Sequence, residues 1–75
     1  MADTQVREVG VRPEGIRLGQ LLKLAGFAGT GSDAKVLLEL GEVEVNGQPE
    51  SRRGRQLQVG DVVECGEEKV RLIPT

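Results

Sequence analysis

Residues 41–47 read Gly-Glu-Val-Glu-Val-Asn-Gly, and this stretch decides the fold. Polar and apolar residues alternate from 42 to 45, which is the period of a half-buried β-strand. The Asn46-Gly47 pair that follows is a strong hairpin signal, because both central positions of a type I′ turn need a positive φ. The returning strand is predicted over 48–51, at the edge of a sheet, because Pro49 has no N–H to donate.

Two amphipathic helices are predicted before this hairpin. The first covers residues 17–25, because apolar residues recur there at i, i+3, i+4 and i+7. After a glycine-rich connector, the second is predicted over 33–40, with Ser32 and Asp33 as candidate N-caps. The apolar faces consist of Leu18, Leu21, Leu22 and Ala25 in the first helix and of Ala34, Leu37 and Leu38 in the second.

Short strands complete the chain on both sides of the helices and the hairpin. A weak strand signal lies over 5–12, where valines are spaced among polar residues. After the hairpin, further strands are predicted near 62–65 and 70–73, separated by turns that contain Gly. An order of strand, two helices and then several strands predicts the α+β class.

The composition excludes several classes of function. The chain has 75 residues, with ten Lys or Arg, twelve Asp or Glu, no His and a net charge of −2. Without His, and with Cys65 as the single cysteine, catalytic triads that use His, zinc fingers and internal disulfides are excluded. Phe27 is the single aromatic residue, so aromatic stacking platforms for single-stranded nucleic acid are excluded as well. We therefore expect no catalytic residue, no metal, no cofactor and no small-molecule substrate.

The same features set expectations for location. No apolar run approaches the roughly 20 residues that a membrane-spanning helix needs. The first ten residues have no apolar core of the kind found in signal peptides. A single cysteine is typical of a reducing compartment, so we expect a cytoplasmic protein without a membrane partner.

The basic residues are more clustered than the net charge suggests. Arg52, Arg53 and Arg55 follow the hairpin almost together. Such a cluster is either a solvated turn of mutually repelling guanidinium groups or a phosphate clamp, since guanidinium forks match phosphate oxygens. The second interpretation gains weight if the helices bring other cations nearby, namely Arg17, Lys23 and Lys35. Lys35 also has a simpler interpretation as the i,i+4 partner of Glu39.

Taken together, these motifs resemble the S-four RNA-binding domain, which is named after the fourth protein of the small ribosomal subunit. The resemblance covers residues 16–64. The motifs that carry it are Arg17-Leu18, Ser32-Asp33-Ala34-Lys35, Val45-Asn46-Gly47 and Gly60-Asp61. Leu-Leu-Lys-Leu-x-Gly at 21–26 and Glu-Ser-Arg-Arg at 50–53 are most similar to the small stand-alone YbcJ-like branch of that superfamily.

The resemblance implies a helical pair packed on a small, mainly antiparallel twisted sheet of about four to five short strands. It implies one domain, with an N-terminal strand and turn over 1–15, the core over 16–64 and a C-terminal strand over 65–75. It also implies that structured RNA, with ribosomal RNA as one candidate, is held by basic residues of the helices and of the loop after the hairpin. The candidate RNA-binding residues are Arg17, Lys23, Ser32 as the cap of the second helix, Lys35, Arg52, Arg53 and Arg55.

This chain departs from the family pattern at five positions, and four of these changes thin its positive surface. Family members usually carry further basic residues where this chain has Gln20, Gly31, Val36 and Glu39. They also carry an acidic residue where this chain has Gly19. We therefore expect binding that is weak or restricted to a particular structured RNA. Because one aromatic residue cannot support base stacking, we expect the chain to recognise the backbone shape of a folded RNA, and we expect it to be a monomer.

Two alternatives stay open at the level of sequence. A protein-interaction adaptor would use the acidic surface of residues 57–75, which implies a protein partner. A β-grasp sulfur carrier has a similar Val-Asn-Gly hairpin and Gly-Asp turn. Such carriers react through a C-terminal Gly-Gly, whereas this chain ends in Ile73-Pro74-Thr75, so we expect the second alternative to fail.

Overall fold

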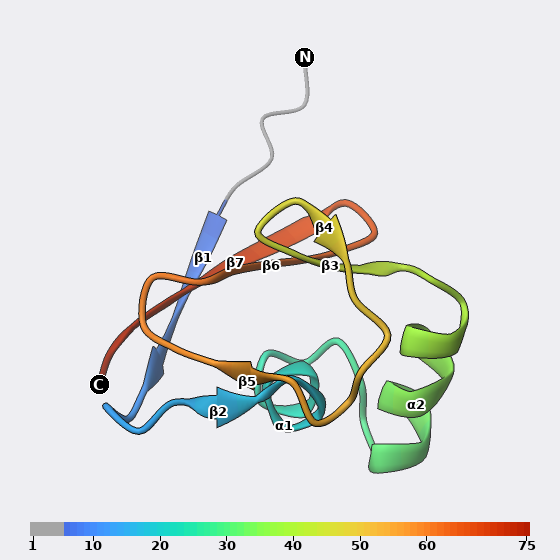
Figure 1. Ribbon diagram of the computed structural model, residues 1–75, viewed down its shortest axis with the longest axis horizontal. Helices are drawn as coiled ribbons and strands as arrows, with labels where there is room; N and C mark the ends of the chain where they lie inside the picture. The colour runs from blue at the N-terminus through green and yellow to red at the C-terminus, as the bar shows by residue number, and fades with distance from the viewer. Residues whose placement is uncertain (1–5) are drawn as a thin grey trace.

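The computed structural model describes residues 6–75, which form the α+β fold that the sequence predicts (Figure 1). The helices are α1 (Leu18–Leu24) and α2 (Gly31–Glu39). The strands are β1 (Val6–Val11), β2 (Ile16–Arg17), β3 (Val43–Val45), β4 (Gln48–Pro49), β5 (Gln56–Leu57), β6 (Val62–Cys65) and β7 (Glu68–Pro74).

The main sheet has the strand order β1-β7-β6-β3-β4. The pairs β7–β6, β6–β3 and β3–β4 are antiparallel, whereas β1 runs parallel to β7 with Val6 opposite Lys69. A separate two-stranded ribbon pairs β2 with β5, placing Ile16 opposite Leu57. In Figure 1 the main sheet crosses the upper part of the molecule, and the ribbon and both helices lie below it.

The predicted hairpin at 41–47 is confirmed. Asn46 and Gly47 both have positive φ, 52° and 81°. The Asn46 side chain also ties the turn to the start of β6, because its Nδ2 donates to Asp61 Oδ1 at 3.1 Å and its Oδ1 accepts the Val62 N–H at 2.9 Å. The returning strand β4 lies at the edge of the sheet, as Pro49 indicated, but it ends there and not at residue 51.

The core lies between the helical pair and the sheet. Apolar side chains from α1, the ribbon and the inner strands are fully buried: Leu18, Leu21, Leu22, Leu57, Leu72, Val43, Val45, Val63 and Val70. Burying one such side chain stabilises a fold by about 1.5–3 kcal/mol. Since Leu18, Leu21 and Leu22 share one face of α1, their burial fixes which face of that helix points outward.

The prediction that Ser32 or Asp33 caps α2 is wrong. The helix begins two residues earlier than expected, and its N-cap is Thr30, whose Oγ1 accepts the Asp33 N–H at 3.1 Å. Thr30 has the extended backbone that an N-cap needs, with φ −138° and ψ 170°. Ser32 and Asp33 therefore both lie inside the first turn of the helix.

The other expected elements agree with the structure to within a few residues. The first helix begins at Leu18 because Arg17 belongs to β2, and Ala25 is its C-cap. The predicted strand over 5–12 corresponds to β1, with Gln5 outside the described residues. Within residues 6–75, no helix has the length and apolar character needed to cross a membrane.

Candidate nucleic-acid interface

The arginine segment, residues 51–55, packs against the start of α1. The first amides of any helix lack partners within the helix. Here the Leu18 N–H donates to the Arg55 carbonyl oxygen at 2.8 Å, and the Gly19 N–H donates to the Arg53 carbonyl oxygen at 2.9 Å. The main chain of the arginine segment therefore caps α1 and is held close to it.

Gly19 makes this close approach sterically possible. A Cβ atom at position 19 would lie 2.5 Å from Arg53 Cγ and 3.2 Å from Arg53 Cδ. Such distances are shorter than any ordinary van der Waals contact. The absence of a side chain at Gly19 therefore leaves the space that the Arg53 side chain occupies.

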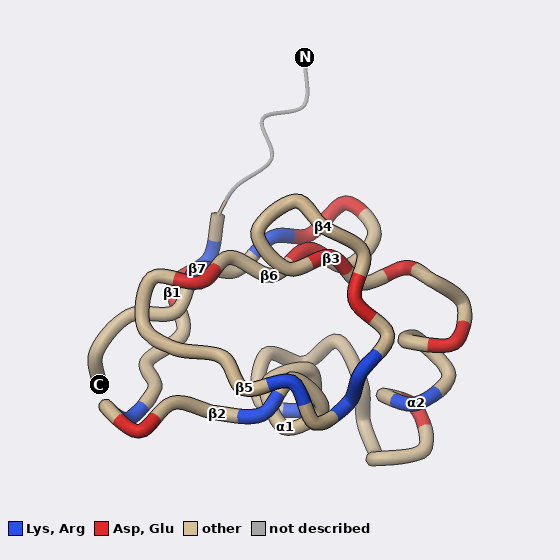
Figure 2. The backbone as a smooth tube through the Cα atoms, viewed as in Figure 1, with Lys and Arg blue, Asp and Glu red and all other residues tan. Residues whose placement is uncertain are grey.

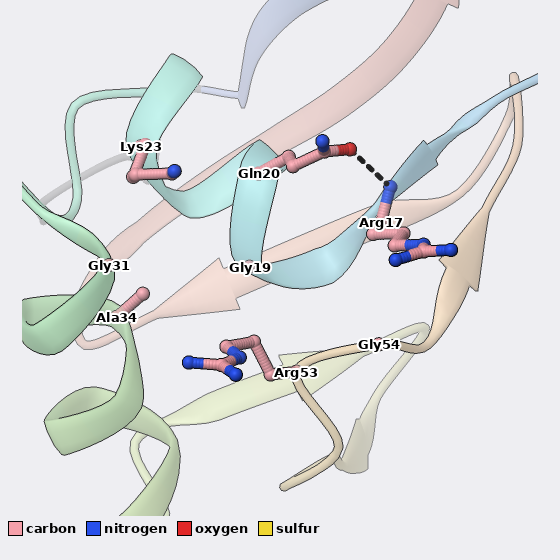
Figure 3. Close-up of a pocket in the computed structure, with 8 residues that line it drawn as sticks. All are labelled: Arg17, Gly19, Gln20, Lys23, Gly31, Ala34, Arg53 and Gly54. Atoms are coloured by element: carbon pink, nitrogen blue, oxygen red, sulfur yellow. Dashed lines mark hydrogen bonds between the residues drawn. The ribbon is translucent and has the colours of Figure 1, made fainter.

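Arg53 reaches from its segment into the space between α1 and α2 (Figure 3). A cavity of about 330 Å³ opens there, with cationic side chains among small residues. Its lining consists of Arg17, Gly19, Gln20, Lys23, Gly31, Ala34, Arg53 and Gly54. An adjoining cavity of about 300 Å³ is lined by Lys35, Leu38, Glu39, Ser51 and Arg53.

We call these two cavities together the basic groove, because both share Arg53. Four exposed cations face it from three parts of the chain: Arg17 and Lys23 in or beside α1, Lys35 in α2, and Arg53 in the arginine segment. Lys35 Nζ also lies 3.9 Å from Glu39 Oε1, which confirms the i,i+4 pairing. Both side chains are about two-thirds exposed, so this ion pair is weak and leaves Lys35 able to meet an anion.

The other two arginines of the segment point at Glu50, which is buried. Arg52 donates through Nε to Glu50 Oε2 at 3.2 Å and through Nη2 to Oε1 at 3.0 Å. Arg55 donates through Nη1 to Glu50 Oε1 at 3.0 Å. The main-chain N–H groups of Ser51 and Arg52 complete the set, at 3.0 and 3.1 Å from Oε2.

These contacts have a clear electrostatic effect. The hydrogen bonds from Arg52, and then that from Arg55, lower the pKa of Glu50 to about 2 although burial opposes the charge. In turn, the hydrogen bond to Glu50 raises the pKa of Arg52. The expected repulsion among three neighbouring arginines is therefore relieved by one carboxylate.

A family model for the S4 domain matches residues 9–73. The chain belongs to this family. The S4 domain is the module that the sequence motifs resemble, so this assignment confirms the resemblance and rules out the β-grasp alternative.

Two known proteins are similar to this S4 domain over most of its length. The probable ribosome maturation protein RlbA of Bacillus subtilis (strain 168) is 52% identical over 56 residues, which cover 75% of this chain and 79% of that protein. The solution structure of YbcJ from E. coli superposes with a TM-score of 0.63 at 29% identity, covering 97% of this chain and 91% of that one. The YbcJ structure is described as revealing an αL motif involved in RNA-binding.

The candidate residues of this S4 domain fall into two groups. The structure brings Arg17, Lys23, Lys35 and Arg53 together around the basic groove. Arg52 and Arg55 lie beside it but are engaged by Glu50, and Ser32 is exposed in the first turn of α2. Two contributors, Gly19 and Glu50, were missed at the level of sequence. Their signals were a glycine inside a helical pattern and a glutamate next to an arginine cluster.

Charge is distributed unevenly over the S4 domain (Figure 2). The largest group of basic residues lies around α1, β2 and β5, whereas most acidic residues lie along the main sheet, its turns and α2. On the sheet side, Lys69 pairs with Glu64 at 3.4 Å and Arg71 pairs with Glu8 at 2.8 Å. The net charge of −2 is therefore the sum of a basic groove and a more acidic sheet, and it does not describe either surface alone.

Proposed function

We propose that this S4 domain binds structured RNA, with ribosomal RNA as the partner, by contacts between the basic groove and backbone phosphates, and that it does so without catalysis. The observation that carries the proposal is the convergence of Arg17, Lys23, Lys35 and Arg53 on two adjoining cavities. The similarity to YbcJ, whose structure reveals a motif involved in RNA-binding, and to RlbA, a probable ribosome maturation protein, supports it. A ribosomal partner also implies a cytoplasmic location.

The shape of the groove suits a sugar–phosphate backbone. Gly19, Gly31, Ala34 and Gly54 line the first cavity, so little side-chain bulk stands between a backbone and the cations. The aromatic side chain of Phe27 is half-buried, and the Arg7 guanidinium lies 5.6 Å from the centre of its ring. Because the Phe27 ring is already covered by Arg7, it is not free to stack on an RNA base. Recognition of the RNA therefore depends on the positions of its phosphates and on the shape of the RNA helix.

The number of groove cations sets the strength of the salt dependence. Each neutralised phosphate contributes about 0.9 to the slope of log affinity against log salt on duplex nucleic acid. If all four groove cations contact phosphates, the slope reaches about −3.6, and it is shallower if fewer do. The acidic sheet repels RNA, which favours approach with the groove facing the partner.

The experiment is a titration of a ribosomal RNA hairpin at several salt concentrations. We expect Arg53→Ala to lower the steepness of the slope by about 0.9 and to weaken binding at low salt. Arg71→Ala is the matched control, because it removes the same charge from an exposed ion pair on the sheet. We expect its slope to equal that of the wild type.

Two results would contradict the proposal. If the wild type fails to bind structured RNA at low salt, the RNA-binding function is wrong. If a triple Arg17, Lys23, Arg53→Ala variant binds as tightly as the wild type, RNA binds elsewhere on the domain.

A further inference from the structure

Glu50 occupies the Nε and Nη2 donors of Arg52 and the Nη1 donor of Arg55, so a phosphate can reach these two guanidinium groups only through their remaining donors. Its side chain is 8% exposed, and its two oxygens accept every contact described above from Ser51, Arg52 and Arg55. Arg52 binds it through Nε and Nη2, the two parallel donors of the guanidinium fork. Carboxylate and phosphate are recognised by the same fork, so one guanidinium group cannot offer that fork to both at once.

Breaking the contacts of Arg52 and Arg55 with Glu50 is unfavourable. The buried carboxylate would then still bear the cost of desolvation, but it would lose the electrostatic attraction to the arginines that offsets this cost. A new contact between a solvent-exposed arginine and a phosphate is weak by comparison. Arg52 and Arg55 therefore stay with Glu50 when a polyanion approaches.

Arg53 is oriented differently from its two neighbours. Its side chain lines both cavities of the basic groove, and its main chain is held by the Gly19 N–H. The arginine segment thus contains three guanidinium groups but presents one to the groove. Fewer free cations weaken contacts that any polyanion can make, and this leaves discrimination to the shape of the groove.

We propose that Glu50 is a positioning residue that sets specificity, acting as an internal counter-ion that withholds Arg52 and Arg55 from RNA. This inference rests on the proposed function, because RNA is the ligand from which the arginines are withheld. Glu50 acts through the arginines and does not itself touch the RNA. Its removal should therefore increase indiscriminate binding to polyanions.

The test compares Glu50→Gln with Glu44→Gln on a generic RNA duplex at several salt concentrations. Both variants remove one negative charge, but Glu44 is a half-buried residue of β3 and lies outside the contacts of the arginine segment. We expect Glu50→Gln to steepen the salt slope by about 0.9–1.8, as one or two arginines gain phosphate contacts. Glu44→Gln should retain the wild-type slope. A Glu50→Gln slope equal to or shallower than that of Glu44→Gln would overturn the inference.

A second variant decides the question if Glu50→Gln does not fold. Arg52→Ala removes an exposed side chain that the inference says is unused by RNA. We expect its slope to equal that of the wild type, whereas a decrease of about 0.9 would show that Arg52 binds phosphate and would refute the role of Glu50.

Elution from a heparin column separates this inference from the proposed function. If none of the variants binds RNA, the RNA function fails, but the counter-ion role can still be measured on this polyanion. Glu50→Gln should then elute at higher salt than Glu44→Gln. Elution of the two variants at the same salt concentration would overturn the inference.

Discussion

Replacing Gly19 with alanine tests how closely the arginine segment packs on α1. In a helix interior, alanine is normally favoured over glycine by about 0.5–1 kcal/mol. At this position the new Cβ would lie 2.5 Å from Arg53 Cγ. The Arg53 main chain cannot simply move away, because its carbonyl oxygen accepts the Gly19 N–H at 2.9 Å.

The expected magnitude follows from these opposing effects. Overpacking by a methyl group typically costs about 1–3 kcal/mol. After subtracting the helix-propensity gain, we expect Gly19→Ala to lower the free energy of unfolding by about 0–2.5 kcal/mol. Because Arg53 must leave its place on α1, the salt slope of RNA binding should also fall by up to about 0.9.

Urea denaturation of matched glycine variants measures this effect. Gly31 is the first residue of α2 and has open space beside it. Apart from its chain neighbours and its own helix backbone, residues 6–75 place no heavy atom within 4 Å of the position that a Cβ would occupy. We therefore expect Gly31→Ala to be neutral or stabilising by up to about 1 kcal/mol. If Gly19→Ala is as stable as Gly31→Ala and binds RNA like the wild type, then Gly19 does not position Arg53.

Three further predictions concern the hairpin, the core and acid stability. Gly47→Val should destabilise the domain by about 1–3 kcal/mol, because a β-branched residue is strained at a φ of 81°; unchanged urea unfolding would contradict the turn assignment. Leu57→Ala should cost about 2–5 kcal/mol, because the side chain is fully buried; a loss below 1 kcal/mol in the same assay would mean that the β2–β5 ribbon is not part of the core. The pKa of Glu50 is lowered from 4.5 to about 2, so its stabilising contribution is complete above pH 4.5 and disappears as the pH falls towards 2. The difference in unfolding free energy between the wild type and Glu50→Gln should shrink over that interval, and a constant difference would refute the assignment.

The features that were predictable from sequence are those with a local period or a distinctive turn. The stretch 41–47 specified its own hairpin, and the spacing of Leu18, Leu21 and Leu22 specified the inner face of α1. The β2–β5 ribbon was missed because strands of two residues are too short to show a period. The parallel pairing of β1 with β7 was missed because the alternation of polar and apolar residues within a strand does not indicate which other strand it pairs with.

The candidate site shows the same division between residue type and orientation. The types and approximate positions of its cations followed from the sequence, but the directions of the side chains did not. Arg52, Arg53 and Arg55 are alike in sequence, and only the burial of Glu50 separates the two engaged arginines from the one that lines the groove. The cap of α2 was misplaced because Thr30, Ser32 and Asp33 are all good N-caps, and the choice among them depends on where the connector ends.

The parallel pairing of β1 with β7 has a consequence for the order of folding. It joins residues 6–11 to 69–74, while β7 itself is an inner strand of the sheet. Contacts this distant in sequence form late, because the intervening chain must first be brought together. A nascent chain that stops before Glu68 lacks the strand that holds both β1 and β6 in place. We therefore expect the nascent domain to stay unfinished during its own translation, and to gain a stable groove only after residues 68–74 have emerged from the ribosome that makes it.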